Sequence, residues 1–291
     1  SAVLDNPLDR APVRVLDLAL DPVEARALAL PLMRAALESA RRELKPHGPF
    51  WAGTLAALAA GLDGPTVMGQ GLLARFIDYE IERNRRGLGI RFVELKIGTG
   101  ERKSELEPDV YVGAVDLPLG EGFVRLQGSV DRVDQGERGL EIIDYKTGSA
   151  KSMSEIRDGA AFQLPIYLAA VSAKTGCAPW GMAYLKTPLL GVIDVVDVTQ
   201  ARGKPAYDVS ALVTQALPRR LGGILGALSK GVFVHLPARP PGGSHSPCNY
   251  CEFSTACARR EDVIVARQDR ANTDPASLVG AYRPDTPPAR Q

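Results

Sequence analysis

The first part of the chain carries the apolar pattern of helices. Asp21-Pro22-Val23-Glu24 combines an N-cap residue, a proline suited to the first helical turn and an acidic residue near the positive helix end. The Ala- and Leu-rich stretch that follows predicts a helix to about residue 45, which Pro31 is expected to kink or split. Two further helices are predicted over 49–62 and 67–86, the second with an apolar stripe at residues 72, 73, 76 and 77.

From residue 90 the pattern changes to the β-rich runs of strands. Antiparallel strands come first, followed by a crossover helix, more strands and a last helix. This order predicts an α/β fold, with a mixed central β-sheet flanked by helices. Residues 1–20 show no clear period, and from about residue 271 we expect little fixed structure. The strands are predicted over 90–97, 110–117, 122–134, 140–147, 180–187 and 191–198, and the helices over 154–174 and 208–230.

Two of these strands bring charged side chains together. The sequence Gly136-Glu-Arg-Gly139 is typical of a hairpin turn, and a two-residue loop there places Asp131 opposite Asp144. Lys146 lies on the same face as Asp144, because alternate residues of a strand share a face. Carboxylates this close repel each other unless a cation lies between them. The hairpin therefore predicts a site for Mg²⁺ or Mn²⁺, which prefer such oxygen ligands and often accompany phosphate.

The alternative is a hairpin whose charges simply face water, which is the usual environment of charged residues in strands. We expect that environment for Arg132, Asp134 and Glu141. Asp131 and Asp144 differ, because Asp is depleted in strands and yet occupies two paired positions here among valine and isoleucine residues.

Composition narrows the function classes only a little. The 291 residues are 45% hydrophobic and 24% charged, as in an ordinary globular protein. The net charge of +1 gives no general electrostatic attraction to nucleic acid, so a DNA-binding surface would have to be local. No apolar run reaches the length of a membrane span, and no secretory signal opens the sequence. The short basic runs 83–86, 219–220 and 259–260 are candidate patches, or solvated helix ends.

Three of the four cysteines, Cys248, Cys251 and Cys257, lie within ten residues. This clustering favours a metal or cluster site in a reducing compartment, the cytoplasm, over disulfides. Three thiolates are too few for a closed tetrahedral site, and His245 could complete a zinc site. Cys177 is expected to be a small residue in a helix-to-strand turn, with a replacement ligand as the alternative.

Four motifs now point to one family. Residues 128–134 (Gly-Ser-Val-Asp-Arg-Val-Asp) and 144–148 (Asp-Tyr-Lys-Thr-Gly) resemble motifs II and III of the PD-(D/E)XK nucleases, in their RecB-like branch. Gln163-Leu-Pro-Ile-Tyr167 resembles that branch's Gln-x-x-x-Tyr motif, and the cysteine triplet resembles that of its iron–sulfur members. Their order is similar to that in the nuclease domain of AddB-type helicase–nuclease subunits, over roughly residues 70–260.

The resemblance implies a restriction-endonuclease-like core and a set of roles. Asp131, Asp144 and the backbone carbonyl of Tyr145 would hold Mg²⁺ or Mn²⁺, with Glu94 approaching the metal from the preceding strand. Lys146 would orient the attacking water or stabilise the transition state. Gln163 and Tyr167 would support the metal and the DNA phosphate. The implied divisions are a helical lead-in packed on the core (1–88), a nuclease core (89–232), a cysteine-cluster segment (233–262) and a flexible tail (263–291).

The implied function is metal-dependent, exonuclease-type hydrolysis of DNA. It would belong to a helicase–nuclease that processes double-strand ends for recombinational repair together with a partner subunit. One alternative is a free-standing exonuclease like those of CRISPR adaptation. The other is a catalytically weakened, cluster-stabilised DNA-binding module. No helicase motif is present in the sequence, so the helicase function would have to come from elsewhere.

Two parts of the family pattern are missing from this sequence. The family has a histidine ligand in a Gly-x-x-x-His helix, and none of His47, His235 and His245 has that context. The family also takes its first cluster cysteine from upstream of the core, where this chain has none. We expect that the chain is a C-terminal fragment and that an N-terminal remainder of the same polypeptide supplies both. The intact protein would then carry a 4Fe–4S cluster, lost or replaced by zinc in this chain.

Overall fold

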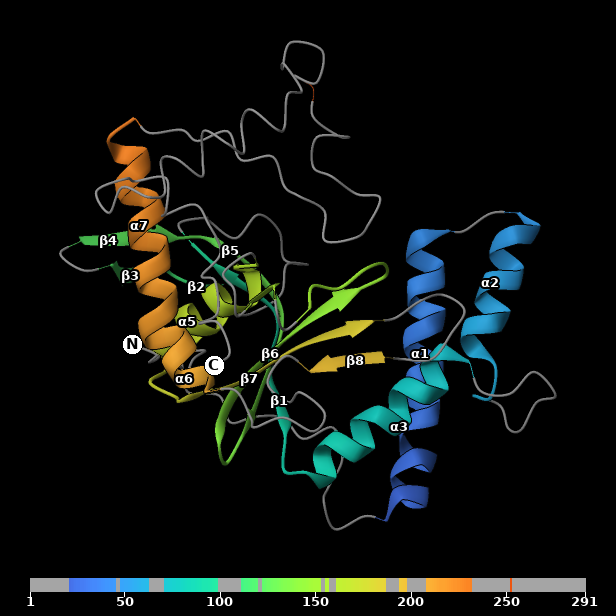
Figure 1. Ribbon diagram of the computed structural model, residues 1–291. Helices are drawn as coiled ribbons and strands as arrows, with labels where there is room; N and C mark the ends of the chain where they lie inside the picture. Colours follow the sequence, from blue (N-terminus) through green and yellow to red (C-terminus); the bar gives the residue numbers. More distant parts are fainter. Residues whose placement is uncertain are drawn as a thin grey trace, which may run out of the picture.

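The computed structural model describes residues 21–45, 48–62, 71–98, 111–119, 122–152, 155–156, 161–186, 194–197, 208–231 and 252. Three helices lie on one side of a mixed sheet, and the later helices lie on the other side (Figure 1). This is the predicted α/β fold. The helices are α1 (Pro22–Leu44), α2 (Pro49–Ala59), α3 (Leu72–Arg85), α5 (Gln163–Thr175), α6 (Val209–Ala211), the π-helical turn η2 (Leu212–Ala216) and α7 (Leu217–Ser229).

The central sheet has six strands in the order β2-β1-β5-β6-β7-β8. β1 with β2 and β6 with β7 are parallel pairs, and the other neighbours are antiparallel. β3 and β4 form a separate antiparallel pair. The strands are β1 (Gly89–Ile97), β2 (Tyr111–Val112), β3 (Val115–Leu119), β4 (Gly122–Leu126), β5 (Gly128–Gly136), β6 (Gly139–Lys146), β7 (Pro179–Lys186) and β8 (Asp194–Asp197).

Helix α1 begins as its sequence predicts. The Asp21 carboxylate accepts hydrogen bonds from the backbone N–H groups of Val23 and Glu24, at 2.6 and 3.1 Å. Pro31 does not split the helix, which runs unbroken to Leu44. Pro31 has no N–H, so the carbonyl of Ala27, four residues earlier, lacks its usual helical partner. Both residues are exposed, so water can supply that hydrogen bond.

The three leading helices share a small core of their own, which includes Ala25, Ala74, Ile77 and Ile81. The expected stripe on α3 was therefore only partly right, because Phe76 is only half-buried while Ala74 and Ile81 are buried. The buried face of α3 is rotated from the predicted stripe, and it also carries charged residues toward the sheet.

The main core lies between the sheet and α5. Helix α5 makes the crossover between the parallel strands β6 and β7 and contacts both of them. Its Leu164 and Leu168 are fully buried against the sheet. The sheet contributes Phe92, Leu95, Val130, Val133, Leu140, Ile142, Met182 and Tyr184 to this core.

Three predicted elements are divided in the structure. The expected strand 122–134 is two strands, β4 and β5, which belong to different sheets, and the expected strand 110–117 is β2 and β3. In the last helix, the Leu217 N–H bonds to the Leu212 carbonyl five residues back, which makes the π turn. Pro218 follows directly and has no N–H to continue regular pairing at that point. None of the helices in the described ranges is both long and apolar enough to cross a bilayer.

Candidate active site

The predicted hairpin forms with the predicted register. Gly136 pairs with Gly139 across the two-residue turn, and Arg132 with Ile143. Gly139 has a φ of +132°, which a glycine adopts without strain. The paired ladder ends at Arg132, one position before Asp131 would meet Asp144. There the Asp131 carboxylate accepts a hydrogen bond of 2.9 Å from the Tyr145 N–H, a contact with the partner strand made by a side chain.

The strands are irregular at the level of Asp131, which the sequence did not predict. Val130 and Val133 are both fully buried in the core beneath α5, although residues three apart in a regular strand point to opposite faces. On β1, Phe92 and Leu95 are likewise three residues apart and both buried in this core. The irregularity concerns the pairing of β5 with β1; the ladder of β5 with β6, which predicts that the three charged residues share one face, has no register shift over its length.

Glu94 lies at this irregularity. The pairs on either side of it put Glu94 level with Asp131, and its φ of +51° is left-handed. Its side chain is exposed and has no hydrogen-bond or ion-pair partner among the described residues. Glu94 therefore lies level with Asp131 on the neighbouring strand, but no hydrogen bond joins the two side chains in the described structure.

Asp144 is the most constrained carboxylate of the site. It is 3% exposed, its Oδ1 accepts a 2.9 Å hydrogen bond from Gln163 Nε2, and its Oδ2 lies 2.6 Å from Lys146 Nζ. Burial raises the pKa of Asp144 above its ordinary value; Lys146 opposes that shift and the charge of Asp131 adds to it. Asp131 and Asp144 are thus close enough to interact electrostatically.

The buried Asp144 Oδ2 is relevant to metal binding. It lies 2.6 Å from the Lys146 ammonium, which is the charged partner of this oxygen in the described part of the chain. An ionised carboxylate oxygen has two lone pairs, so the contact with Lys146 leaves one with which it can bind a metal ion. No third Asp, Glu, His or Cys completes a cluster with Asp131 and Asp144 in the described residues. Two carboxylates fit Mg²⁺, which is usually held by one or two carboxylates and several waters.

Lys146 and the two residues of α5 complete the arrangement. The Lys146 ammonium lies 5.7 Å from the centre of the Tyr184 ring, and its side chain keeps 30% of its exposure. Gln163 is the first residue of α5, and Tyr167 lies one turn further on, half-buried against the core. A Cβ atom on Gly128 would be 3.3 Å from Tyr167 Cε1, so the ring lies directly against β5.

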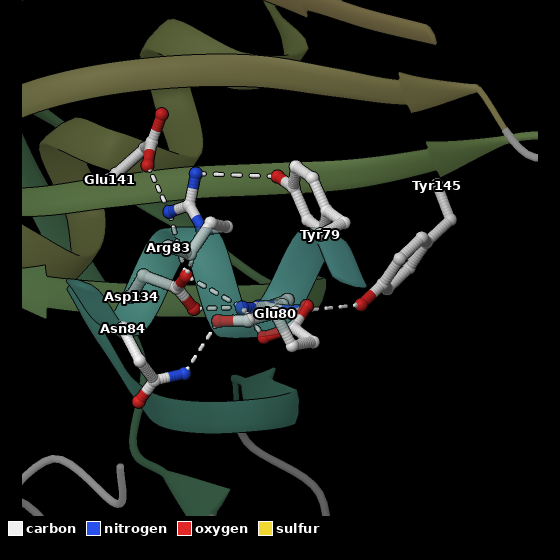
Figure 2. A network of polar contacts seen from close by, with 8 residues as sticks. Tyr79, Glu80, Arg83, Asn84, Asp134, Glu141 and Tyr145 are labelled. Carbon is white, nitrogen blue, oxygen red and sulfur yellow. Dashed lines mark hydrogen bonds and ion pairs between the residues drawn. The ribbon is translucent and has the colours of Figure 1, made fainter. Parts of the chain in front are cut away.

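Behind the hairpin is a buried set of ion pairs that the sequence analysis missed. Arg132, Asp134 and Glu141 do not face water as expected; they are buried with Glu80 and Arg83 of α3 (Figure 2). We call these five residues the charge network. Glu80 could have been suspected from the sequence, because it lies three residues after Ile77 on the buried face of the helix, and Arg83 follows Glu80 at the same spacing.

Each guanidinium of the charge network is bound by carboxylates from two elements. Arg83 donates to Asp134 at 2.7 and 3.0 Å and to Glu141. Arg132 donates to Asp134 at 2.6 and 2.7 Å and to Glu80. Burial alone would lower the pKa values of these arginines, but the carboxylates hold them above their ordinary range. The network therefore joins α3 to β5 and β6 through charged hydrogen bonds.

The remaining predicted site residues are the cysteines and histidines. Cys248, Cys251, Cys257, His47, His235 and His245 lie outside the described residues. Cys177 is described: it follows α5 directly, as expected, is half-buried, and accepts a 3.1 Å contact from Arg91 Nη1.

Comparisons with known proteins identify the family to which this chain is similar. A family model described as the PD-(D/E)XK nuclease superfamily matches residues 21–258. A protein of Clostridium perfringens strain ATCC 13124, named as a subunit of an ATP-dependent helicase/deoxyribonuclease, is 47% identical over 68 residues, 22% of this chain and 6% of that protein. The proteins of the same name from strains 13 and SM101 are 47% and 46% identical over the same length. The match thus spans a small part of these relatives.

Proposed function

Because the chain belongs to the PD-(D/E)XK nuclease superfamily, we propose that it is a deoxyribonuclease that depends on Mg²⁺ or Mn²⁺ and hydrolyses DNA in the manner of an exonuclease. The observation that carries this proposal is the environment of Asp144. Its carboxylate is buried, interacts electrostatically with Asp131, and contacts Gln163 through one oxygen and the Lys146 ammonium through the other. A carboxylate pair next to an amine can supply metal ligands and a positive charge near the scissile phosphate, which supports metal-assisted phosphodiester hydrolysis.

In this proposal each residue has a separate task. Asp131 and Asp144 would hold the metal, with the backbone carbonyl of Tyr145. When bound, the metal would polarise the scissile phosphate and acidify a water. Lys146 would orient the attacking water or stabilise negative charge on the phosphate. Gln163 holds the Asp144 carboxylate through its hydrogen bond.

Tyr167 and Glu94 would have supporting tasks. Tyr167 would keep α5 seated on β5, because its ring lies against Gly128. Glu94 lies level with Asp131 on the neighbouring strand, so it would approach the metal through a bridging water.

We further propose that the nuclease acts on double-strand ends within a helicase–nuclease that serves recombinational repair. The name of the Clostridium perfringens relatives supports this, since it joins a helicase and a deoxyribonuclease in one enzyme. The helicase function would come from an N-terminal remainder of the polypeptide and a partner subunit. DNA would be bound mainly through its phosphates, which suits a nuclease that acts on any sequence.

The catalytic proposal is tested with linear DNA in Mg²⁺, in Mn²⁺ and in excess EDTA. Asp144→Asn and Lys146→Ala should each lower the cleavage rate by orders of magnitude while the protein stays folded. Asp116→Asn is a matched control, because Asp116 is an exposed carboxylate of β3 that pairs with Arg125. Undiminished cleavage by the Asp144 variant, or by the wild type in EDTA, would contradict the proposal. Tight DNA binding without cleavage would instead favour the non-catalytic module.

A separate proposal concerns the cysteine segment, taken as residues 233–262. Cys248, Cys251 and Cys257 would bind an iron–sulfur cluster in the intact protein, on the support of their spacing. Full-length protein purified without air should contain iron and sulfide and absorb broadly in the visible range. Stoichiometric zinc without iron would contradict the cluster. Loss of Cys251 without loss of stability would contradict a structural role for the segment.

A further inference from the structure

The charge network lies directly behind the two acidic residues of the site. Arg132 follows Asp131 in the chain, and its side chain is 2% exposed. Its guanidinium is bound on two sides, by Asp134 and by Glu80 of α3. Residues 131 and 132 therefore connect the candidate active site on one side of the hairpin with α3 on the other.

Tyr145 makes a second connection of the same kind, between Asp144 and Lys146 in the chain. Its backbone N–H donates to the Asp131 carboxylate at 2.9 Å. Its hydroxyl accepts a 3.4 Å hydrogen bond from Arg132 Nη1, and Figure 2 shows this side chain reaching toward the network from β6. The main chain of Tyr145 thus touches the site while its side chain touches the network.

Backbone pairing with β5 does not extend to the Asp144–Lys146 segment. The β5–β6 ladder ends at the pair of Arg132 and Ile143, whereas pairing with β7 continues to Lys146. Beyond that last pair, the described contacts from β5 to the Asp144–Lys146 segment are made by side chains. They are the Asp131 carboxylate on the Tyr145 N–H and the Arg132 guanidinium on the Tyr145 hydroxyl.

We propose that Arg132 and the Tyr145 hydroxyl are positioning residues that fix the Asp144–Lys146 segment for metal binding, with Glu80 of α3 anchoring Arg132. This inference rests on the proposed function, since it assumes that the site binds a divalent metal. Groups that orient metal ligands from behind commonly change metal affinity by about 10- to 100-fold when removed. The fixed guanidinium provides such an orienting group here.

The test compares two variants, each of which removes a tyrosine hydroxyl that accepts a hydrogen bond from a buried arginine. Tyr145→Phe removes the contact with Arg132. Tyr79→Phe removes the Tyr79 hydroxyl, which accepts a 3.3 Å hydrogen bond from Arg83 Nη1 in the same network. Tyr79 lies on α3 and contacts neither the hairpin turn nor the Asp144–Lys146 segment in the described hydrogen bonds. Both variants keep every backbone carbonyl and every carboxylate.

Two measurements decide the matter: Mn²⁺ affinity by calorimetry, and amide hydrogen exchange of residues 144–146 in metal-free protein. Tyr145→Phe should weaken Mn²⁺ binding about tenfold and speed that exchange. Tyr79→Phe should change neither, although both variants lose similar thermal stability. Equal Mn²⁺ affinity and equal exchange in the two variants would overturn the positioning role.

The proposed function can fail separately from this inference. If the wild type and Asp144→Asn both fail to bind Mn²⁺ and to cleave DNA, the metal-dependent nuclease proposal fails. In that case hydrogen exchange in the metal-free protein still decides whether the Tyr145 hydroxyl fixes the segment.

Discussion

Gly128 lies under the ring of Tyr167, at the start of the strand that carries Asp131. Most side chains at this position would push the ring away, because even a methyl group would be 3.3 Å from Tyr167 Cε1. The close packing of Tyr167 therefore explains why the first charged motif begins with a glycine. It lets α5, and with it Gln163, lie close to the hairpin.

Gly128→Ala should accordingly destabilise the protein by about 1 kcal/mol, because the added methyl group forces Tyr167 or β5 to move. Gly122→Ala is the matched control: it also lies in a strand, and nothing is within 4 Å of an added Cβ. That control should be neutral or slightly stabilising, since alanine restricts the unfolded chain. Urea unfolding of both variants measures the difference, and equal stabilities would refute the packing role of Gly128.

At the scale of elements, α3 is attached to the sheet mainly by charge. The leading helices have a separate apolar core, while Glu80 and Arg83 of α3 bind residues of β5 and β6. Buried ion pairs of this kind add little net stability over a hydrophobic contact, but they are costly to break on one side. The position of α3 against the hairpin thus depends on the network being complete.

Arg83→Met should lower the free energy of unfolding by about 3–5 kcal/mol, because it leaves the buried Asp134 and Glu141 carboxylates without this partner. Arg86→Met tests the same substitution at the end of the helix, where the 3.0 Å pair with Glu82 is exposed. The loss there should be at most about 0.5 kcal/mol. Chemical denaturation compares the two, and a cost for Arg83→Met as small as that for Arg86→Met would show that the network is dispensable.

At the scale of the whole molecule, burial of tyrosines links stability to alkaline pH. Burial raises the pKa of Tyr184 to about 12, with the charge of Asp144 adding to the shift. Burial also raises the pKa values of Tyr79 and Tyr145. All three tyrosines belong to the hairpin, its neighbouring strand or α3, so the centre of the molecule is the part most affected.

Stability should therefore fall as the pH rises above about 10, where unfolded tyrosines begin to lose their protons. Between that pH and about 12 the unfolded state releases the Tyr184 proton and the folded state keeps it, which favours unfolding. Thermal unfolding from pH 8 to 11.5, followed with tyrosinate absorbance, measures this. Tyr184→Phe cannot ionise and should lose less stability over the same range; an identical pH dependence in both proteins would exclude this contribution from Tyr184.

The hairpin and its acidic residues followed from the sequence because their contacts are local. The two glycines of the turn fix the pairing of β5 with β6, and that register brings Asp131 near Asp144 within fourteen residues of chain. Gln163 and Tyr167, which the family resemblance singled out, lie four residues apart on α5 and therefore share a face. The mixed sheet followed from the order of the elements, since a crossover helix between strands implies a parallel pair.

Only the tertiary structure decided where the neighbouring charges point. Arg132 and Glu80 are 52 residues apart and Arg83 and Glu141 are 58 apart, so no local pattern pairs them. The local sequence around an arginine in a strand is the same whether its guanidinium faces water or donates to a buried carboxylate. The irregularity at Asp131 and Glu94 likewise depends on how β1, β5 and α5 pack together. The sequence by itself determined the hairpin register that brings Asp131 close to Asp144, and long-range packing determined what surrounds the hairpin.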